Sequence, residues 1–370
     1  MALKIEELDP NEEPLKGNPF WDGHEAVYWI TDPECGLKAY IALHSLTLGP
    51  ALGGCRIHAY AREEDALTDV LRLAHGMSYK SALAGLPLGG GKSVIIADAH
   101  QEKTPEMIRA MGRAVQALEG RYVIAEDVGS TEADMRLMSE ESAYVTGVPA
   151  RDTDAKTVAG DPSPYTARGI FSGIRSAAGH RYGTESLKDK RIGVQGAGNV
   201  GLHLIRLLAE DGAQVIVADP RPDALQRALE AGAAKTVDTD AIWEQEVEVF
   251  APCALGGILN QDTIPRLRAD IVAGGANNQL WRQKEDLALL EEREILYAPD
   301  FLINAGGVIM VWAEYACKQG EIAAEEATPE KIGKRVDGIG PVLDNILKSA
   351  ADENMNTLQA AEAMAETRLH

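Results

Sequence analysis

The sequence is short of aromatic residues and of positive charge. Only 5% of the 370 residues are aromatic, and 36 lysines and arginines face 57 aspartates and glutamates, which gives a formal net charge of -21. An acidic excess of this size excludes a general affinity for nucleic acid or for an anionic membrane surface. Any anionic ligand must therefore be held by locally placed cations.

Cysteine and histidine are few and scattered, which argues against a disulfide framework or a metal centre. The four cysteines form no CxxC pair and no His/Cys cluster at metal-ligand spacing: Cys35, Cys55, Cys253 and Cys317. We therefore expect reduced thiols and no metal site. Among the eight histidines, His75 and His203 fall within helical patterns and are interpreted as packing or surface residues.

The sequence also lacks a targeting signal and a hydrophobic run long enough to cross a membrane. Residues 1–14 are acidic, whereas a secretory signal is basic and then apolar. No apolar run approaches the ~18 residues of a membrane-spanning helix. These absences predict a cytoplasmic protein without a membrane partner. The first twenty residues are expected to carry little regular structure.

Glycine and aliphatic residues are abundant and favour an α/β fold. Thirty-six glycines and 45% hydrophobic residues suit a chain with many tight strand-to-helix turns. The length favours about two domains, and the turn-rich residues 147–164 mark the boundary between them. Before it, residues 26–30 and 37–46 predict a β-hairpin, and residues 63–77 predict an amphipathic helix.

Two lysines between residues 76 and 93 stand in an unusual setting. Lys80 and Lys92 lie among small and apolar residues around a glycine-rich turn, with no acid nearby in the sequence. One cation could hold an anionic substrate while the other, its pKa lowered by its neighbour and by desolvation, acts as a base. In the structural alternative, Lys80 only lies along a helix surface and residues 89–91 are only a loop. The two lysines together favour an active site.

Residues 91–93, Gly-Lys-Ser, also match the end of a phosphate-binding P-loop. That motif needs four residues between its first glycine and the Gly-Lys-Ser/Thr, and it must open a helix. Here five residues separate Gly85 from Gly91, and residues 94–97 read as a strand. The sequence therefore does not favour a nucleotide-hydrolysing enzyme.

Two further groups are placed where they could complete a site. The strand predicted over residues 121–129 contains Glu126 and Asp127 near its end. They are either solvated loop carboxylates or the source of the anion that a substrate amine requires beside two lysines. Leu52 and Gly53 lie in a glycine-rich interruption of a strand pattern. Because glycines let a ligand approach the backbone, they are candidates for a pocket wall, and a plain turn is an equal alternative.

A dinucleotide-binding pattern follows the boundary. Gly196, Gly198 and Gly201 form a GxGxxG motif between a predicted strand and a predicted helix, and the next predicted strand ends at Asp219. This context is that of a Rossmann fold, in which the acid hydrogen-bonds the ribose 2′-hydroxyl. Asp219 favours NAD over NADP because it repels a 2′-phosphate, although the neighbouring Arg221 weakens that preference.

Further strand-type segments predict a doubly wound parallel sheet. Three loops of small or amide residues are expected at the carboxyl ends of its strands, where ligands bind in such sheets: residues 252–256, 274–279 and 299–307. Asn277 and Asn278 could hydrogen-bond a ribose or a carboxamide, or they could cap a helix. Thr166 lies near the amino end of the helix predicted over residues 165–182.

Together these motifs resemble the glutamate/leucine/phenylalanine/valine dehydrogenase family, most closely its leucine dehydrogenase branch. The match spans about residues 40–315 in the family's order and rests on these segments: GMSYK at 76–80, GGGK at 89–92, AED at 125–127, VQGAGNVG at 194–201, ANNQ at 276–279 and APDFLINAGGV at 298–308. The resemblance implies reversible, NAD-dependent oxidative deamination of an L-amino acid to a 2-oxo acid and ammonia.

The resemblance also implies roles for individual residues. Lys80 is similar to the lysine that holds the substrate α-carboxylate, Lys92 to the catalytic lysine, and Asp127 to the carboxylate that exchanges protons with the amino group. The family's side-chain pocket corresponds to small or apolar residues, which implies an aliphatic substrate such as leucine, valine or isoleucine: Leu52, Gly53, Ala125, Val308 and Val311. The alternatives are the same chemistry on phenylalanine or tryptophan, and a non-catalytic dinucleotide-binding regulator.

The implied fold has two domains with the cleft between them. Residues 1–148 form an N-terminal α/β substrate-binding and oligomerisation domain, completed by a helix over residues 338–370, and residues 149–337 form a Rossmann NAD-binding domain. The implied partners are the amino acid, its 2-oxo acid and ammonia, with no nucleic acid, and a homo-oligomer is expected. The residues expected to bind the cofactor are Gly196, Gly198, Asn199, Val200, Gly201, Asp219, Thr166, Asn277 and Asn278.

Overall fold

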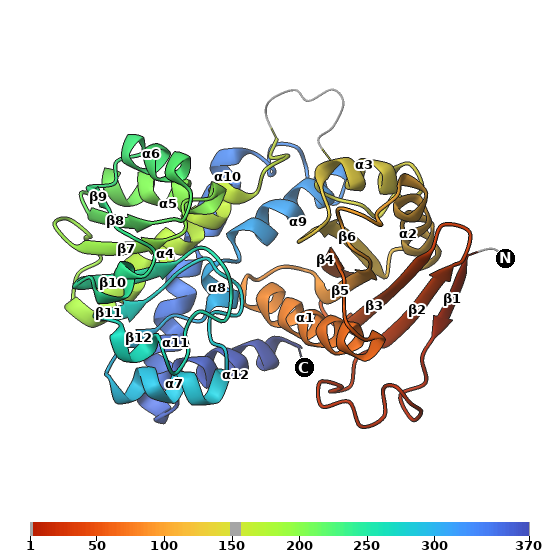
Figure 1. The fold of residues 1–370 in the computed structure, drawn as a ribbon, viewed down its shortest axis with the longest axis horizontal. Helices are drawn as coiled ribbons and strands as arrows, with labels where there is room; N and C mark the ends of the chain where they lie inside the picture. Colours follow the sequence, from red (N-terminus) through yellow and green to blue (C-terminus); the bar gives the residue numbers. More distant parts are fainter. Residues whose placement is uncertain (1–2, 149–156, 370) are drawn as a thin grey trace. The chain divides into compact units, whose positions relative to one another are not determined.

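The computed structural model describes residues 3–148 and 157–369 (Figure 1). Two compact units divide the chain. Unit 1 has three segments: the residues up to Gly160, Val311–Ala327 and the residues from Ala365. Unit 2 has two segments, Asp161–Met310 and Thr328–Met364. No helix in the described part of the chain is long and apolar enough to cross a membrane.

Unit 1 is built on a six-stranded mixed sheet in the order β1-β2-β3-β5-β4-β6. β4 runs parallel to β5 and to β6, and the other neighbours are antiparallel. The strands are β1 Lys4–Glu7, β2 Ala26–Asp32, β3 Leu37–Ser45, β4 Ala51–His58, β5 Gly89–Ile96 and β6 Tyr122–Glu126. Two apolar clusters pack one face against α1 and the other against α2 and α3. These helices are α1 Glu63–Leu83, α2 Pro105–Ala117 and α3 Glu132–Ser139.

The predicted hairpin and the first helix are confirmed. β2 pairs antiparallel with β3, and the amphipathic helix α1 runs on far enough to include Lys80 in its last turn. The expectation of little structure in the first twenty residues is wrong, because β1 pairs with β2, with Lys4 opposite Thr31.

The glycines expected in loops lie inside strands instead. The interruption predicted at Leu52 and Gly53 is part of β4, and the turn predicted at residues 89–91 is the start of β5. A Cβ on Gly53 would lie 1.7 Å from the carbonyl oxygen of Gly91, so a side chain has no room there. Close approach of backbone, and not turn formation, explains glycine in these strands.

Replacing Gly53 tests this explanation. Gly53→Ala is expected to lower the free energy of unfolding by about 3 kcal/mol, because the methyl group meets backbone that cannot rotate away. Gly76→Ala is the matched control: Gly76 lies in α1 with nothing within 4 Å of an added Cβ, and alanine there should be neutral or stabilise by up to ~1 kcal/mol. Urea denaturation midpoints measure both, and equal midpoints would contradict the packing argument.

Unit 2 is a doubly wound parallel sheet, as predicted, in the order β12-β11-β10-β7-β8-β9. The strands are β7 Arg191–Gln195, β8 Gln214–Ala218, β9 Lys235–Thr236, β10 Val247–Pro252, β11 Ala269–Val272 and β12 Leu296–Tyr297. The helices of this unit are α4 Ser163–Tyr182, α5 Asn199–Glu210, α6 Pro222–Glu230, α7 Gln283–Glu292, α8 Asp300–Ile303 and α10 Pro329–Asp337, with short 3-10 turns η1 Ala241–Glu244 and η2 Ile264–Arg266.

Two predictions for the last third of the chain need correction. The segment 299–307 is not a loop, because it contains α8 and the first residues of α9 (Gly306–Lys318). The single helix over 338–370 is two helices, α11 (Ile339–Glu353) and α12 (Thr357–Leu369). α11 packs on α4 in unit 2, so only the residues from Ala365 belong to unit 1.

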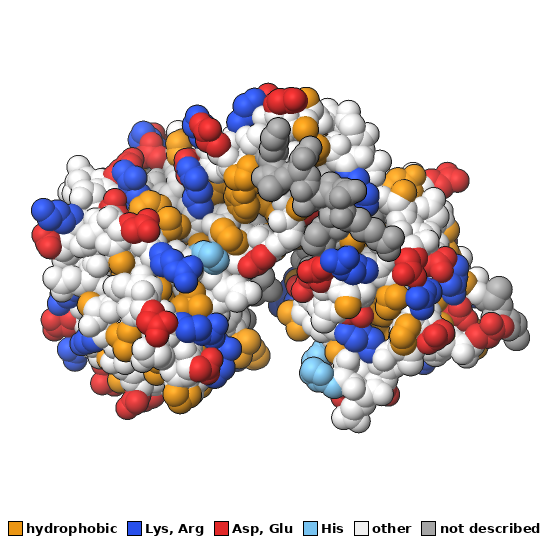
Figure 2. Space-filling view, turned by 90° about the horizontal axis from the view of Figure 1, so that it is seen from above, with side chains coloured by type: hydrophobic (Ala, Val, Ile, Leu, Met, Phe, Trp, Pro, Cys, Tyr) orange, Lys and Arg blue, Asp and Glu red, His pale blue; other side chains and the backbone are white. Residues whose placement is uncertain are grey.

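Charges of both signs are mixed on one face of the molecule. On the face that Figure 2 shows, lysine and arginine side chains are interspersed with aspartate and glutamate side chains. The net charge of -21 is therefore not gathered into one patch on this face.

Candidate active site

A largely buried ion pair joins two strands of the unit 1 sheet. The Nζ atom of Lys92 is 2.6 Å from Oδ2 of Asp127, and the two side chains expose 8% and 20% of their surface. Lys92 comes from β5, and Asp127 follows the last residue of β6. β4 lies between these strands, so the pair forms across it. Although no acid lies near Lys92 in the sequence, the sheet supplies one.

Glycine in β4 makes this pairing possible. A Cβ on Gly54 would lie 2.6 Å from the Cβ of Asp127, so any larger residue would displace the carboxylate. On the other side of the pair, a Cβ on Gly90 would lie 2.0 Å from the backbone nitrogen of Ser78, which places α1 directly against β5. The glycines thus bring together the elements that carry Lys80, Lys92 and Asp127.

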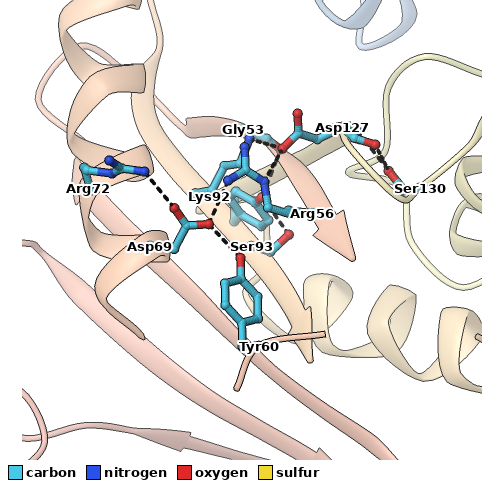
Figure 3. A network of polar contacts seen from close by, with 10 residues as sticks. Gly53, Arg56, Tyr60, Asp69, Arg72, Lys92, Ser93, Asp127 and Ser130 are labelled. Atoms are coloured by element: carbon cyan, nitrogen blue, oxygen red, sulfur yellow. Dashed lines mark hydrogen bonds and ion pairs between the residues drawn. The ribbon is translucent and has the colours of Figure 1, made fainter. Parts of the chain in front are cut away.

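A second cation, Arg56, also contacts Asp127. Its Nε atom lies 3.4 Å from Oδ2 of Asp127, and its Nη1 atom donates to Asp69 Oδ2 at 2.7 Å (Figure 3). Burial by itself would raise the pKa of Asp127, but the charges of Lys92 and Arg56 outweigh burial and hold that pKa below its usual value. Asp127 is therefore ionised at neutral pH in this arrangement.

Asp69 is itself held from two sides. The hydroxyl of Tyr60 donates to Oδ2 of Asp69 at 2.6 Å, and Nη2 of Arg72 donates to Oδ1 at 3.1 Å. Sequence reasoning did not single out Arg56 or Asp69. The available signal was the period of a strand: Gly54 and Arg56 are two residues apart in β4 and so face the same side as each other.

The loop after β6 is fixed by Ser130. Its hydroxyl accepts from the backbone N–H of Asp127 at 2.9 Å and donates to the carbonyl oxygen of Asp127 at 3.0 Å. Glu126, the other carboxylate considered from the sequence, is exposed at the end of β6. The structure therefore brings Asp127, and not Glu126, to Lys92.

The other predicted substrate residues are distributed over several elements. Lys80 is partly buried in α1. Leu52 is 2% exposed in β4, and Ala125 is partly buried in β6. Val308 and Val311 lie one turn apart on α9 and are both partly buried. Val308 falls in unit 2, and the others belong to unit 1.

The glycine motif of unit 2 has the geometry that a pyrophosphate requires. Gly196 has a φ of 98°. A Cβ on Gly201 would lie 2.1 Å from the carbonyl oxygen of Gly196, whereas a Cβ on Gly198 would have nothing within 4 Å. No side chain caps α5, which begins at Asn199. Its first amides, including that of Val200, are therefore available to an anion beside the open position at Gly198.

Asp219, the residue expected to bind the ribose, lies directly after β8 and is buried. Its Oδ2 atom accepts from the backbone N–H of Ala197 at 2.8 Å. Its Oδ1 atom accepts from the backbone N–H of Arg221 at 2.9 Å and from Nε of Arg221 at 3.1 Å. Burial alone would raise the pKa of Asp219, but hydrogen bonds from Arg221 and Ala197 lower it overall. The carboxylate thus joins the glycine loop to a half-exposed guanidinium.

The loop that carries Asn277 and Asn278 is held by Asn304 and Gln279, two residues to which the sequence analysis assigned no role of their own. Asn277 and Asn278 are exposed, and neither caps a helix, because α7 is preceded by Arg282. Nδ2 of Asn304 donates to Oδ1 of Asn277 at 2.7 Å. The buried Gln279 donates from Nε2 to the carbonyl oxygen of Gly274 at 2.7 Å, so the loop around Asn277 is held from within.

Thr166 lies in the first turn of α4. Its hydroxyl donates to the carbonyl oxygen of Pro162 at 3.3 Å. A Cβ on Gly307 would lie 2.6 Å from that hydroxyl oxygen, which places Thr166 against the first turn of α9.

Comparison with known proteins agrees with both units. Residues 24–144 match the dimerisation domain of the Glu/Leu/Phe/Val dehydrogenases, and residues 161–222 and 223–370 match the Glutamate/Leucine/Phenylalanine/Valine dehydrogenase domain. The chain belongs to this dehydrogenase family. As a Glu/Leu/Phe/Val dehydrogenase it is an amino acid dehydrogenase, similar to the leucine dehydrogenases.

Its relatives in the family are named for different amino acids. Leucine dehydrogenase of Geobacillus stearothermophilus is 46% identical over 347 residues, which cover 94% of this chain and 90% of that protein. Valine dehydrogenase of Streptomyces virginiae is 48% identical over 294 residues, 78% of this chain and 80% of that protein. The crystal structure of L-tryptophan dehydrogenase from Nostoc punctiforme is 41% identical, with a TM-score of 0.80 over 94% of this chain and 96% of that one.

Proposed function

We propose that this dehydrogenase catalyses the NAD-dependent, reversible oxidative deamination of a branched-chain L-amino acid, with leucine, valine and isoleucine as substrates. The observation that carries the proposal is the buried pair of Lys92 and Asp127, with 2.6 Å between its charged atoms. In the forward direction the amino acid, water and NAD⁺ give the 2-oxo acid, ammonia, NADH and a proton. The 46% identity to a leucine dehydrogenase supports the same assignment.

Three side chains divide the work in this proposal. Lys80 binds the substrate α-carboxylate through its ammonium group. Lys92 in its neutral form takes a proton from the water that attacks the substrate carbon, and Asp127 is close enough to exchange a proton with Lys92 or with the departing amine. Arg56 keeps Asp127 oriented and ionised between these transfers. The shielding of Lys92 from solvent strengthens each electrostatic interaction in the site.

The residues of unit 2 fit a dinucleotide. When bound, the nicotinamide ring supplies hydride transfer. In this proposal the pyrophosphate lies beside Gly198 at the amino end of α5, and Asp219 accepts a hydrogen bond from the ribose. We assign Thr166, Asn277 and Asn278 to the rest of the dinucleotide. The carboxylate of Asp219 favours NAD.

Removing that carboxylate should change the choice of cofactor. Asp219→Ser is expected to shift the ratio of kcat/KM for NAD to kcat/KM for NADP by roughly 100-fold toward NADP, about 3 kcal/mol. The serine no longer repels a 2′-phosphate, and Arg221 loses the partner that now holds its guanidinium. Asp223→Ser is the control, because Asp223 is nearby but pairs with Arg227. An unchanged ratio in Asp219→Ser would remove Asp219 from the ribose site.

The substrate assignment rests on the chemistry of the proposed pocket. Its positions carry no charge that could pair with a glutamate side chain, and small or aliphatic side chains suit an aliphatic substrate: Leu52, Gly53, Ala125, Val308 and Val311. The second candidate is an aromatic amino acid, because a tryptophan dehydrogenase has the same fold with a TM-score of 0.80.

The decisive measurement is NADH absorbance at fixed enzyme and NAD with six amino acids offered in turn. NADH formation with leucine, valine and isoleucine supports the proposal. Formation only with phenylalanine or tryptophan would keep the mechanism and replace the substrate, and formation only with glutamate would contradict the pocket. NADP replaces NAD in a parallel series to test the cofactor.

We also propose that the protein works as a homo-oligomer. The match to a dimerisation domain over residues 24–144 supports this proposal, and all of these residues belong to unit 1. Light scattering on the purified protein gives the number of subunits, and a monomeric mass at working concentration would contradict it.

A further inference from the structure

A second group of chemically active side chains in unit 1 shares no residue with the Lys92–Asp127 pair. It consists of Asp22 and three histidines, His24, His44 and His75, and we call it the Asp22 cluster. Asp22 and His24 precede β2, His44 lies in β3 and His75 in α1. The rings of His24 and His44 meet edge to face with 4.8 Å between their centroids, as do those of His44 and His75.

All three rings direct a nitrogen at the same carboxylate. Nδ1 of His24 lies 3.1 Å and Nε2 of His44 lies 3.3 Å from Oδ1 of Asp22, and Nε2 of His75 lies 3.2 Å from Oδ2. One ligand atom from each of Asp22, His44 and His75 can be chosen so that all lie within 4.8 Å of one another. A modest contraction brings such a set onto one ion, since zinc sits about 2.0–2.1 Å from imidazole nitrogen.

In two of the rings, the hydrogen bond of the nitrogen that faces away from Asp22 indicates which nitrogen carries the lone pair. Nε2 of His24 lies 3.0 Å from the carbonyl oxygen of Leu71, which can only accept, so this nitrogen carries the proton. In the neutral ring, Nδ1 of His24 is then a bare lone pair. It is buried, makes no hydrogen bond of acceptable geometry, and faces Asp22. A lone pair facing a carboxylate is repulsive unless a cation lies between them.

The second nitrogen of His44 also has a hydrogen-bond partner away from Asp22. Its Nδ1 atom lies 2.8 Å from the hydroxyl of Ser78, which can accept the ring proton and leave Nε2 of His44 bare toward Asp22. Metal-ligating histidines use their second nitrogen in this way, to donate to a carbonyl, carboxylate or other acceptor that fixes the tautomer. The contact of His24 with Leu71 is the outer hydrogen bond of a metal ligand, and the contact of His44 with Ser78 is compatible with one.

We propose that the Asp22 cluster is a zinc site, in which Asp22, His44 and His75 are the ligands and Nδ1 of His24 faces the same carboxylate from the other ring. Imidazole nitrogen and one carboxylate oxygen form a donor set typical of divalent zinc. None of these residues has a role in the deamination proposed above. Its ion would join the segment before β2 to β3 and to α1, the helix that carries Lys80.

This site was not accessible to sequence reasoning, which expected no metal and treated His75 as a packing or surface residue. The four residues are spread over residues 22–75 with no repeated metal-ligand spacing. Only the pairing of strands and the packing of α1 bring them together.

The test uses the full-length protein after treatment with a chelator, with Zn²⁺ alone as the titrant. Isothermal titration calorimetry should show one Zn²⁺ per chain, and Zn²⁺ should raise Tm. In His75→Gln the affinity should fall by more than about 100-fold, because loss of an outer partner alone costs 10–100-fold. His100→Gln, which changes an exposed histidine outside the cluster, should bind as the wild type does.

Cobalt gives a readout that does not depend on the folding of a variant. Co²⁺ added to the wild-type protein should give the visible absorption bands of a tetrahedral site with nitrogen ligands, and Zn²⁺ should abolish them. Absence of these bands, together with no calorimetric Zn²⁺ binding, would overturn the proposal. Equal Zn²⁺ affinity in wild type, His75→Gln and Asp22→Asn would overturn it too, because binding would then lie elsewhere on this acidic surface.

Discussion

Lys92→Ala is expected to lower kcat by about 10³-fold while leaving the affinity for NADH unchanged. Proton transfer by a positioned side chain contributes 10²–10⁴-fold to an enzymatic rate, and Lys92 is the base in the proposed mechanism. Its Nζ atom is buried beside Asp127, and bulk water cannot replace it there. NADH fluorescence titration measures binding, and initial rates with leucine and NAD measure turnover.

Lys103→Ala is the matched control for this experiment. Lys103 is also a partly buried lysine of unit 1, and its Nζ atom lies 2.8 Å from Oδ2 of Asp134. The control variant should lose stability by an amount comparable to Lys92→Ala and keep turnover within an order of magnitude. If Lys92→Ala keeps wild-type turnover, the proposed role of Lys92 is wrong; if both variants lose turnover equally, the loss reflects structure and not proton transfer.

Asp127→Asn is expected to lower kcat by about 10²- to 10³-fold, because the amide cannot take up or release the proton that the carboxylate exchanges. It should also destabilise the fold by ~3 kcal/mol, since Lys92 keeps a buried charge without its partner. Thermal unfolding and initial rates separate the two effects. Asp134→Asn, the other half of the control pair, should change stability much more than turnover.

A double variant sharpens this prediction. If Lys92 and Asp127 act as one unit, Lys92→Ala combined with Asp127→Asn should be little slower than the slower single variant, because residues that act together lose rate non-additively. Multiplication of the two single effects would show that the residues act in separate steps.

The parallel sheet of unit 2 was predictable because its strands are continuous apolar runs. Segments such as Ile192–Val194 and Val215–Val217 are buried on both faces, and such strands need no alternation to be recognised. The glycine motif with its acid was equally visible, since the strand, the turn and the helix follow one another directly along the chain. Local sequence was sufficient to predict those features in which the residues that contact one another are also close together in the sequence.

The strands of unit 1 show where this reasoning fails. Gly53 and Gly90 lie inside β4 and β5, although glycine in general weakens strands and marks turns. Their place depends on the backbone atoms that lie within 3 Å of the position a Cβ would occupy, and no local pattern records that. Arg56 and Asp69 were missed for the same reason, since their link to Asp127 depends on strand order and register. From the residues alone, charge balance left a carboxylate beside the lysines as one alternative, and only the resemblance to the family singled out Asp127.

The bare glycines around the ion pair also bear on the entropy of catalysis. Gly53, Gly54 and Gly90 have no rotamers, so these positions beside Lys92 and Asp127 add no side-chain freedom to the site. A site bordered by longer side chains would have to immobilise them each time a substrate is bound, at about 0.5–1.5 kcal/mol for each. Here that ordering is completed once, when the chain folds, and binding energy from the amino acid is left for aligning the reacting atoms.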